Sequence, residues 1–254
     1  VGVDGTNRLR RSKGADRDAF VMRLAATGAT VDYSGFIGGA DDDQANGIAL
    51  DTSGRAYVTG FSYCDGAAPC STTFPTVTGP RTTHGGGGMD AFVARVDAAG
   101  GTLEYAGFIG GDGGARIGYA IAASGTNAVV AGATDSPTGL GTLSALRTSV
   151  NGRALDASDA FVARVATTGA SLDYLTLLTG AQPTGSESGA DRALAIAVDS
   201  GGSVLVAGET DSVNFPLNAS GSRVGTGPLS SSAGGMDGFW VRLADRHYRL
   251  VLHI

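Results

Sequence analysis

The chain has 254 residues with a formal net charge of −6; 42% of the residues are hydrophobic and 42 are glycine. The negative charge excludes the broad basic surface by which proteins bind nucleic acid. No apolar run approaches the roughly 20 residues that a membrane-spanning helix needs, so we expect no membrane span.

One strand motif recurs four times along the chain, at intervals of 72, 69 and 78 residues. The copies read DAFVMRL from Asp18, DAFVARV from Asp90, DAFVARV from Asp159 and DGFWVRL from Asp237. A second apolar segment follows each copy after a short turn: VDYSGFIGG from Val31, LEYAGFIGG from Leu103, LDYLTLLTG from Leu172 and the altered HYRLVLHI from His247. Short apolar and β-branched runs on both sides of a polar turn predict a hairpin in each copy.

A third unit lies between the copies and divides into two further strands around a polar, glycine-containing turn. It reads GIALDTSGRAYVTG from Gly47, AIAASGTNAVVAG from Ala120 and AIAVDSGGSVLVAG from Ala195. The repeat therefore has four strands, here called a, b, c and d in chain order. We predict an all-β fold, a β-propeller built of four-stranded antiparallel blades, with a β-sandwich of the same hairpins as the alternative.

We expect one repeat domain over residues 1–254. A partial blade covers 1–45, and full blades follow at about 46–116, 117–192 and 193–254. Strand a of each blade would line the axis, where its small residues suit the crowding.

The clearest copy runs from Gly38 to Gly111 and reads GGADDDQANGIALDTSGRAYVTGFS, then TFPT, then GGGGMDAFVARVDAAGGTLEYAGFIGG. In this order the motifs resemble the bacterial seven-bladed β-propeller repeat family, often called the SBBP repeat. The resemblance implies a secreted or cell-surface bacterial protein, often large and multidomain, without established enzymatic activity. Three full blades and a partial one are fewer than seven. That leaves open a fragment of a longer protein, pairing with another copy or a small closed ring.

An antiparallel order of strands a to d places the a–b and c–d turns on one face and the b–c and d–a connections on the other. The b–c connections, at about 63–89, 134–158 and 210–236, are long, and the d–a loop 39–46 is acidic. Long loops on a rigid scaffold commonly carry function. We therefore expect ligand-binding residues on that face: Asp41, Asp42, Asp43, Phe74, His84, Asp112, Glu187 and Phe215.

Each of these candidates also has a structural interpretation. Asp41 and Asp43 suit calcium, the one cofactor considered, or form a solvated acidic turn. His84 precedes glycines as in the oxyanion element of lipases, but no GxSxG motif accompanies it, and we expect an exposed loop residue. Phe74 and Phe215 form an aromatic platform for sugars or fix their loops onto the blade.

Other residues indicate compartment and packing. Cys64 and Cys70 bracket a short loop, and we expect a disulfide between them, which implies an oxidising compartment; the alternative is two free thiols. The Asp that begins each recurrent motif is expected to form a structural hydrogen bond, because it recurs in every copy. The Arg five residues later faces either solvent or the neighbouring blade.

These features predict a non-catalytic, extracellular binding or adhesion module for a glycan or protein ligand. The first alternative is a structural module that packs against other copies or domains. The second is an enzyme acting on polysaccharide, with paired carboxylates such as those of Asp41–Asp43 and Glu187.

Overall fold

A computed structural model of the chain describes residues 9–12, 16–64, 74–86, 88–110, 114–135, 158–180, 190–212, 215, 235–243 and 250–251. All regular secondary structure in these ranges is β-strand, which confirms the predicted all-β class. Cys70, Asp112, Glu187 and Tyr248 lie outside the described residues.

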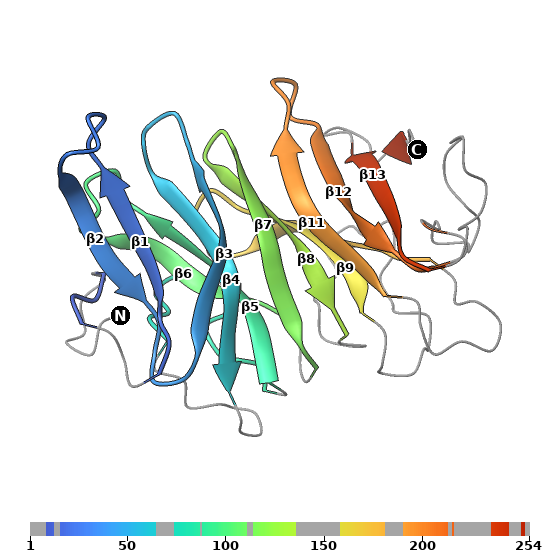
Figure 1. Ribbon diagram of the computed structural model, residues 1–254, viewed down its shortest axis with the longest axis horizontal. Helices are drawn as coiled ribbons and strands as arrows, with labels where there is room; N and C mark the ends of the chain where they lie inside the picture. Colours follow the sequence, from blue (N-terminus) through green and yellow to red (C-terminus); the bar gives the residue numbers. More distant parts are fainter. Residues whose placement is uncertain are drawn as a thin grey trace.

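The strands form four separate antiparallel sheets that follow one another along the chain (Figure 1). The first sheet contains β1 (Ala19–Leu24) and β2 (Val31–Ile37). The second contains β3 (Asp43–Leu50), β4 (Ala56–Cys64), β5 (Gly88–Val96) and β6 (Leu103–Ile109). The third contains β7 (Arg116–Ser124), β8 (Asn127–Thr134), β9 (Asp159–Val165) and β10 (Leu172–Leu178). The fourth contains β11 (Asp191–Val198), β12 (Val204–Thr210), β13 (Asp237–Leu243) and β14 (Leu250–Val251).

Each full sheet pairs its strands in chain order, as the four-strand repeat predicts. The first strands of the three full sheets lie side by side, with β7 in contact with both β3 and β11 (Figure 1). One side of β3 stays open, because Ile48 and Leu50 are exposed. The sheets therefore share a common inner side formed by their first strands, as expected of a propeller.

The core lies between the sheets. In the second and third sheets, the side chains of the third strand point alternately into the contact with the next sheet and into the contact with the preceding sheet. In β5, Ala91 and Val93 pack against the third sheet, whereas Phe92, Ala94 and Val96 pack against the first. The same alternation joins the third sheet to the fourth. Because successive side chains of a strand point to opposite faces, the recurrent motif faces the next sheet with one set of alternate residues and the preceding sheet with the other, which includes the phenylalanine.

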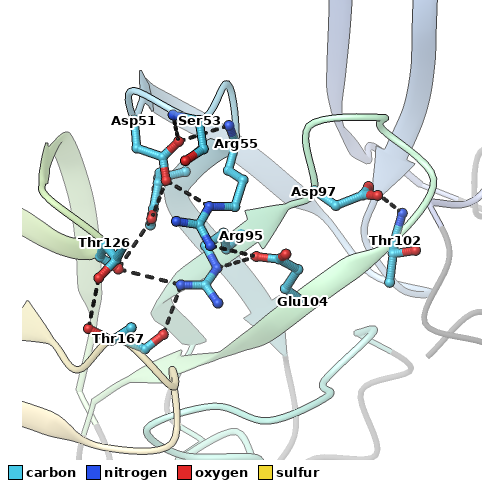
Figure 2. A network of polar contacts seen from close by, with 10 residues as sticks. Asp51, Ser53, Arg55, Arg95, Asp97, Thr102, Glu104, Thr126 and Thr167 are labelled. Atoms are coloured by element: carbon cyan, nitrogen blue, oxygen red, sulfur yellow. Dashed lines mark hydrogen bonds and ion pairs between the residues drawn. The ribbon is translucent and has the colours of Figure 1, made fainter.

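The recurrent arginine joins one sheet to the next (Figure 2). Arg95 is buried and donates from one guanidinium nitrogen to the backbone oxygens of Thr167, at 2.8 Å, and Thr126, at 3.4 Å, both in turns of the third sheet. Arg23 donates in the same way to the backbone oxygen of Ala98 in the second sheet, at 3.1 Å. Of the two interpretations given above, the contact between blades is therefore confirmed for these two residues.

Candidate functional site

Strand direction divides the molecule into two faces. Short turns join the strands at one edge of the sheets, at 25–30, 51–55, 97–102, 125–126, 166–171 and 199–203. The connections at the opposite edge are 38–42, 65–87, 110–115, 135–158, 179–190 and 211–236, and several are much longer. We call this second edge the loop face. Strands β3, β5, β7, β9, β11 and β13 begin at the loop face, so their first side chains lie beneath it.

The acidic d–a loop is shorter than predicted, because β3 begins at Asp43 and not after Asn46. Asp42 is half-exposed and forms an ion pair of 2.7 Å with the exposed guanidinium of Arg17. Asp43 is buried and accepts a hydrogen bond of 2.6 Å from the backbone nitrogen of Gly39. Neighbours in sequence therefore differ in role: the Asp42 side chain is open to solvent, whereas Asp43 belongs to the contact between sheets.

Both phenylalanine candidates are buried. The Phe74 ring lies 5.1 Å from the rings of Phe92 and Phe108, measured between centroids. The ring centroids of Phe215 and Phe239 lie 4.3 Å apart. The aromatic-platform interpretation is therefore wrong for these two rings, which fix their connections onto the sheets by burying apolar area.

His84 was expected to be exposed, and that expectation is also wrong. The side chain is buried and lies edge-on to the ring of Phe108. Its Nδ1 accepts a hydrogen bond of 3.0 Å from the backbone nitrogen of Gly86, which leaves Nε2 to donate to the backbone oxygen of Ser62 at 3.0 Å. Both ring nitrogens are thus occupied by backbone groups, and His84 holds the end of the b–c connection.

Cys64 ends β4 and is buried. Its predicted disulfide partner Cys70 lies outside the described residues, so the bond stays a prediction. The same holds for the binding roles of Asp112 and Glu187.

The structure adds pairings that sequence reasoning missed: within the described residues, a buried polar pair lies at each of the three sheet contacts, directly beneath the loop face. Each pair joins the recurrent Asp, at or near the start of β1, β5 or β9, to the first residue of the next sheet. The pairs are Asp18 with Asp43, Asp90 with Arg116, and Asp159 with Asp191. Aligning the first residues of β3, β7 and β11 would have revealed the position, but only the fold shows that it faces the recurrent Asp.

The central pair is a buried ion pair. The Arg116 guanidinium lies 2.6 Å from an oxygen of the Asp90 carboxylate, and both side chains are fully buried. The other oxygen of Asp90 accepts a hydrogen bond of 2.5 Å from the backbone nitrogen of Gly85. Burial lowers the pKa of Arg116, while the charge of Asp90 raises it.

The two outer pairs join carboxyl groups to carboxyl groups. Burial raises the pKa of Asp43 to about 7, and the negative charges of Asp18 and Asp41 act in the same direction. Hydrogen bonds from Ser62 and Gly39 only partly oppose this rise. A pKa near 7 leaves Asp43 partly protonated at neutral pH, and the protonated form lets two acidic groups share a buried contact.

Asp191 is likewise a buried carboxyl group with a raised pKa, in the contact between the third and fourth sheets. Burial raises its pKa to about 7, and the nearby charge of Asp159 raises it further. The hydroxyls of Thr210 and Ser212 donate to its two oxygens at 2.5 and 3.1 Å. Asp191 is therefore held in place by hydrogen bonds that need no cation.

The carboxyl pair at Asp43 predicts that stability depends on pH. The folded pKa lies above the unfolded value of about 3.8, so the folded state binds the extra proton between the two values. The stabilisation is fully present below about pH 4 and is lost as the pH rises through 7. The variant Asp43→Asn, which resembles the protonated form, should exceed the wild type at pH 8 by about 4 kcal/mol in urea unfolding.

The control for that experiment is the same comparison at pH 5, where Asp43 is already protonated in the folded state. The difference between variant and wild type should therefore grow from pH 5 to pH 8. A difference that is constant over this range would show that Asp43 is ionised in the folded protein.

An open hollow of about 410 Å³ lies at the loop-face end of β1 and β3. The side chains that matter for chemistry are the Arg17–Asp42 ion pair, the exposed ring of Phe20 and the partly exposed ring of Phe61. Within the described ranges, no three carboxylate, imidazole or thiol groups gather closely enough to hold a metal ion. In the same ranges, no helix is long and apolar enough to cross a membrane.

Comparison with known proteins gives one family match. Residues 33–63, from β2 to β4, match the family model described as SBBP, Beta-propeller repeat. A search of curated proteins finds no match. Among solved structures, the crystal structure of BamB from Moraxella catarrhalis is similar at 14% identity and a TM-score of 0.33, over 94% of this chain and 73% of that one. A TM-score this low carries no argument. The matched residues overlap the first part of the clearest copy of the internal repeat, Gly38 to Gly111.

Proposed function

We propose that this propeller module binds an extracellular ligand at its loop face and does not catalyse a reaction. The observation that carries the proposal is the hollow beside β1, which combines an accessible ion pair with aromatic rings. At the opposite edge, the turns that the structure describes have two to six residues, which offer little surface for recognition.

The chemistry of the hollow favours a carbohydrate ligand. The Arg17–Asp42 pair supplies charged donors and acceptors for sugar hydroxyls, because charge-assisted hydrogen bonds are the stronger ones. The rings of Phe20 and Phe61 supply apolar faces for the C–H groups of a sugar. The hollow is open, which suits a portion of a longer chain.

The first test is retention of the protein on a panel of immobilised polysaccharides, with and without calcium. We expect Asp42→Asn to weaken retention about tenfold or more, because one charge-assisted hydrogen bond contributes about 1.5–3 kcal/mol. The control is Asp173→Asn at the turn edge, where a similarly exposed carboxylate pairs with Arg164. This variant should leave retention unchanged.

The same incubation also tests the absence of catalysis. New reducing ends in the polysaccharide would contradict the proposal and make the loop-face carboxylates candidates for catalysis. Retention that requires calcium would assign a metal to the acidic loop around Asp41. Equal retention of both aspartate variants would place binding away from the hollow.

A further inference from the structure

The outer face of the first sheet is exposed where every other sheet is covered. Phe20, Met22 and Leu24 of β1 expose 65%, 46% and 51% of their surface. The same three positions of β5, β9 and β13 are buried by the preceding sheet. We call these three side chains the N-terminal end face. A contiguous exposed apolar face of this kind commonly marks an interaction surface.

In the second and third sheets, the equivalent side chains are covered by the preceding sheet. In the second sheet, the corresponding residue Phe92 packs against Ala19 and Val21 of β1. We call the side of a sheet that faces the next sheet along the chain its forward side, and Ala19 and Val21 are the small residues on the forward side of β1. In the third sheet, Phe161 packs against Ala91 and Val93 in the same way. The chemistry that fits the N-terminal end face is therefore the forward side of another sheet of this repeat.

The fourth sheet presents such a forward side at the other end of the molecule. Trp240 of β13 exposes 38% of its surface and pairs across the strands with Ala207 of β12, which is also exposed. Their neighbours Val206 and Val241 point the opposite way, into the contact with the third sheet. We call Ala207 and Trp240 the C-terminal end face.

Polar groups repeat the same complementarity. Inside the molecule, Arg23 and Arg95 donate to backbone oxygens in the c–d turn of the next sheet. The corresponding arginine of the fourth sheet, Arg242, is exposed beside the C-terminal end face. An exposed c–d turn at 25–30 lies beside the N-terminal end face. Each end thus carries one half of the polar contact that joins neighbouring sheets.

The glycine of the c–d turn contacts a tyrosine ring of the preceding sheet in the second and third sheets, but not in the first. A Cβ atom on Gly169 would lie 2.3 Å from the Tyr105 ring of the preceding sheet, and one on Gly100 would lie 1.9 Å from that of Tyr33. Gly28, with the same left-handed φ of about 70°, has nothing within 4 Å of such an atom. The first sheet therefore keeps the turn that receives a tyrosine ring, with that space open.

We propose that the C-terminal end face of one chain docks on the N-terminal end face of a second copy, head to tail. The contact would continue the sheet-on-sheet packing seen three times inside the chain. Because the two faces differ, the association is heterologous, and it closes into a ring or extends into a filament according to the rotation between copies.

Sedimentation velocity of the purified chain over a range of concentrations tests the proposal. The wild type should form species larger than the 25.2 kDa chain, in a concentration-dependent manner. Met22→Glu and Trp240→Glu each place a charge on one end face and should each sediment as a single chain. Ile48→Glu is the matched control, because Ile48 is comparably exposed on β3 outside both end faces, and it should associate like the wild type. Circular dichroism checks that all variants are folded.

Mixing the two end-face variants identifies the geometry. Met22→Glu retains an intact C-terminal end face and Trp240→Glu an intact N-terminal one, so an equal mixture should form a complex of two chains and nothing larger. A wild type that stays a single chain at all concentrations would overturn the proposal. So would a Trp240→Glu variant that associates by itself, because that result means that two N-terminal end faces pair with each other.

The two proposals share Phe20, which lines the hollow and belongs to the N-terminal end face, so the association test uses substitutions elsewhere on the end faces. Met22 and Trp240 do not line the hollow that contains Asp42. Loss of association in the end-face variants with unchanged polysaccharide retention would separate the two properties, and either proposal can fail without the other.

Discussion

Replacing Arg116 with methionine is expected to lower the free energy of unfolding by about 3–5 kcal/mol, the usual effect of removing one partner of a buried ion pair. Methionine fills much of the space of the arginine but leaves the fully buried Asp90 carboxylate without its cation. The remaining hydrogen bond from Gly85 does not replace that charge. Urea unfolding at pH 7 measures the change.

Arg192→Met in the neighbouring sheet is the control. Arg192 and Glu209 form an ion pair of similar length, 2.7 Å, but both side chains are about one-third exposed. Exposed pairs contribute about 0–1 kcal/mol, so this variant should change stability little. The double variant Asp90→Asn/Arg116→Met should recover most of the lost stability, because no buried charge is left. Equal effects of the two arginine variants would contradict the importance of burial at Asp90.

Replacing Gly132 with alanine is expected to lower the free energy of unfolding by about 3 kcal/mol, at the upper end of the range for an overpacked interior. A Cβ atom on Gly132 would lie 2.1 Å from the backbone oxygen of Ile117 and 2.6 Å from the ring of Phe161. The paired strand β7 has a register shift between Gly118 and Ala120, which brings its backbone towards Gly132. A backbone oxygen cannot rotate away as a long side chain can.

The same contact recurs in the other full sheets, at Gly60 against Gln44 and at Gly208 against Arg192. Gly101→Ala is the control, because a Cβ atom there would meet nothing within 4 Å and the position has no left-handed φ. Its stability should stay within about 0.5 kcal/mol of the wild type. A similarly small effect for Gly132→Ala in thermal and urea unfolding would show that the strands separate easily at this position.

The Gly132 and Arg116 positions show how far sequence reasoning reaches. The glycine that closes each YVTG or VAG motif is visible in the sequence as a repeated position, but its cause, the bulge of the partner strand, requires the sheet. Arg116 is not visible as a site, because Asp43 and Asp191 occupy the same position in other repeats and the three side chains differ in charge. Their common feature is a place in space, opposite the recurrent Asp of the preceding sheet.

Corrections at the loop face have a similar origin. His84 lies in a polar, glycine-rich segment, which predicts exposure, whereas the sequence leaves open whether Phe74 and Phe215 form a platform or fix their loops onto the blade. In the structure these side chains are buried, because the ends of the long connections fold back onto the sheets. Local sequence gives the polarity of a segment, whereas the burial of one ring in it depends on the strands that lie below.

The sequence by itself determined the strands, their antiparallel order and the repeat, because alternation, turn residues and the interval between copies are local or periodic properties. It also separated the face with long connections from the face with short turns. Only the tertiary structure decided which side chains meet between sheets: the carboxyl pairs, the buried ion pair and the inter-sheet arginines. It also showed that Phe20, Met22 and Leu24 are exposed, whereas the equivalent side chains of β5, β9 and β13 are buried between sheets. These contacts join residues far apart in the chain, and their partners are set by how the sheets stack.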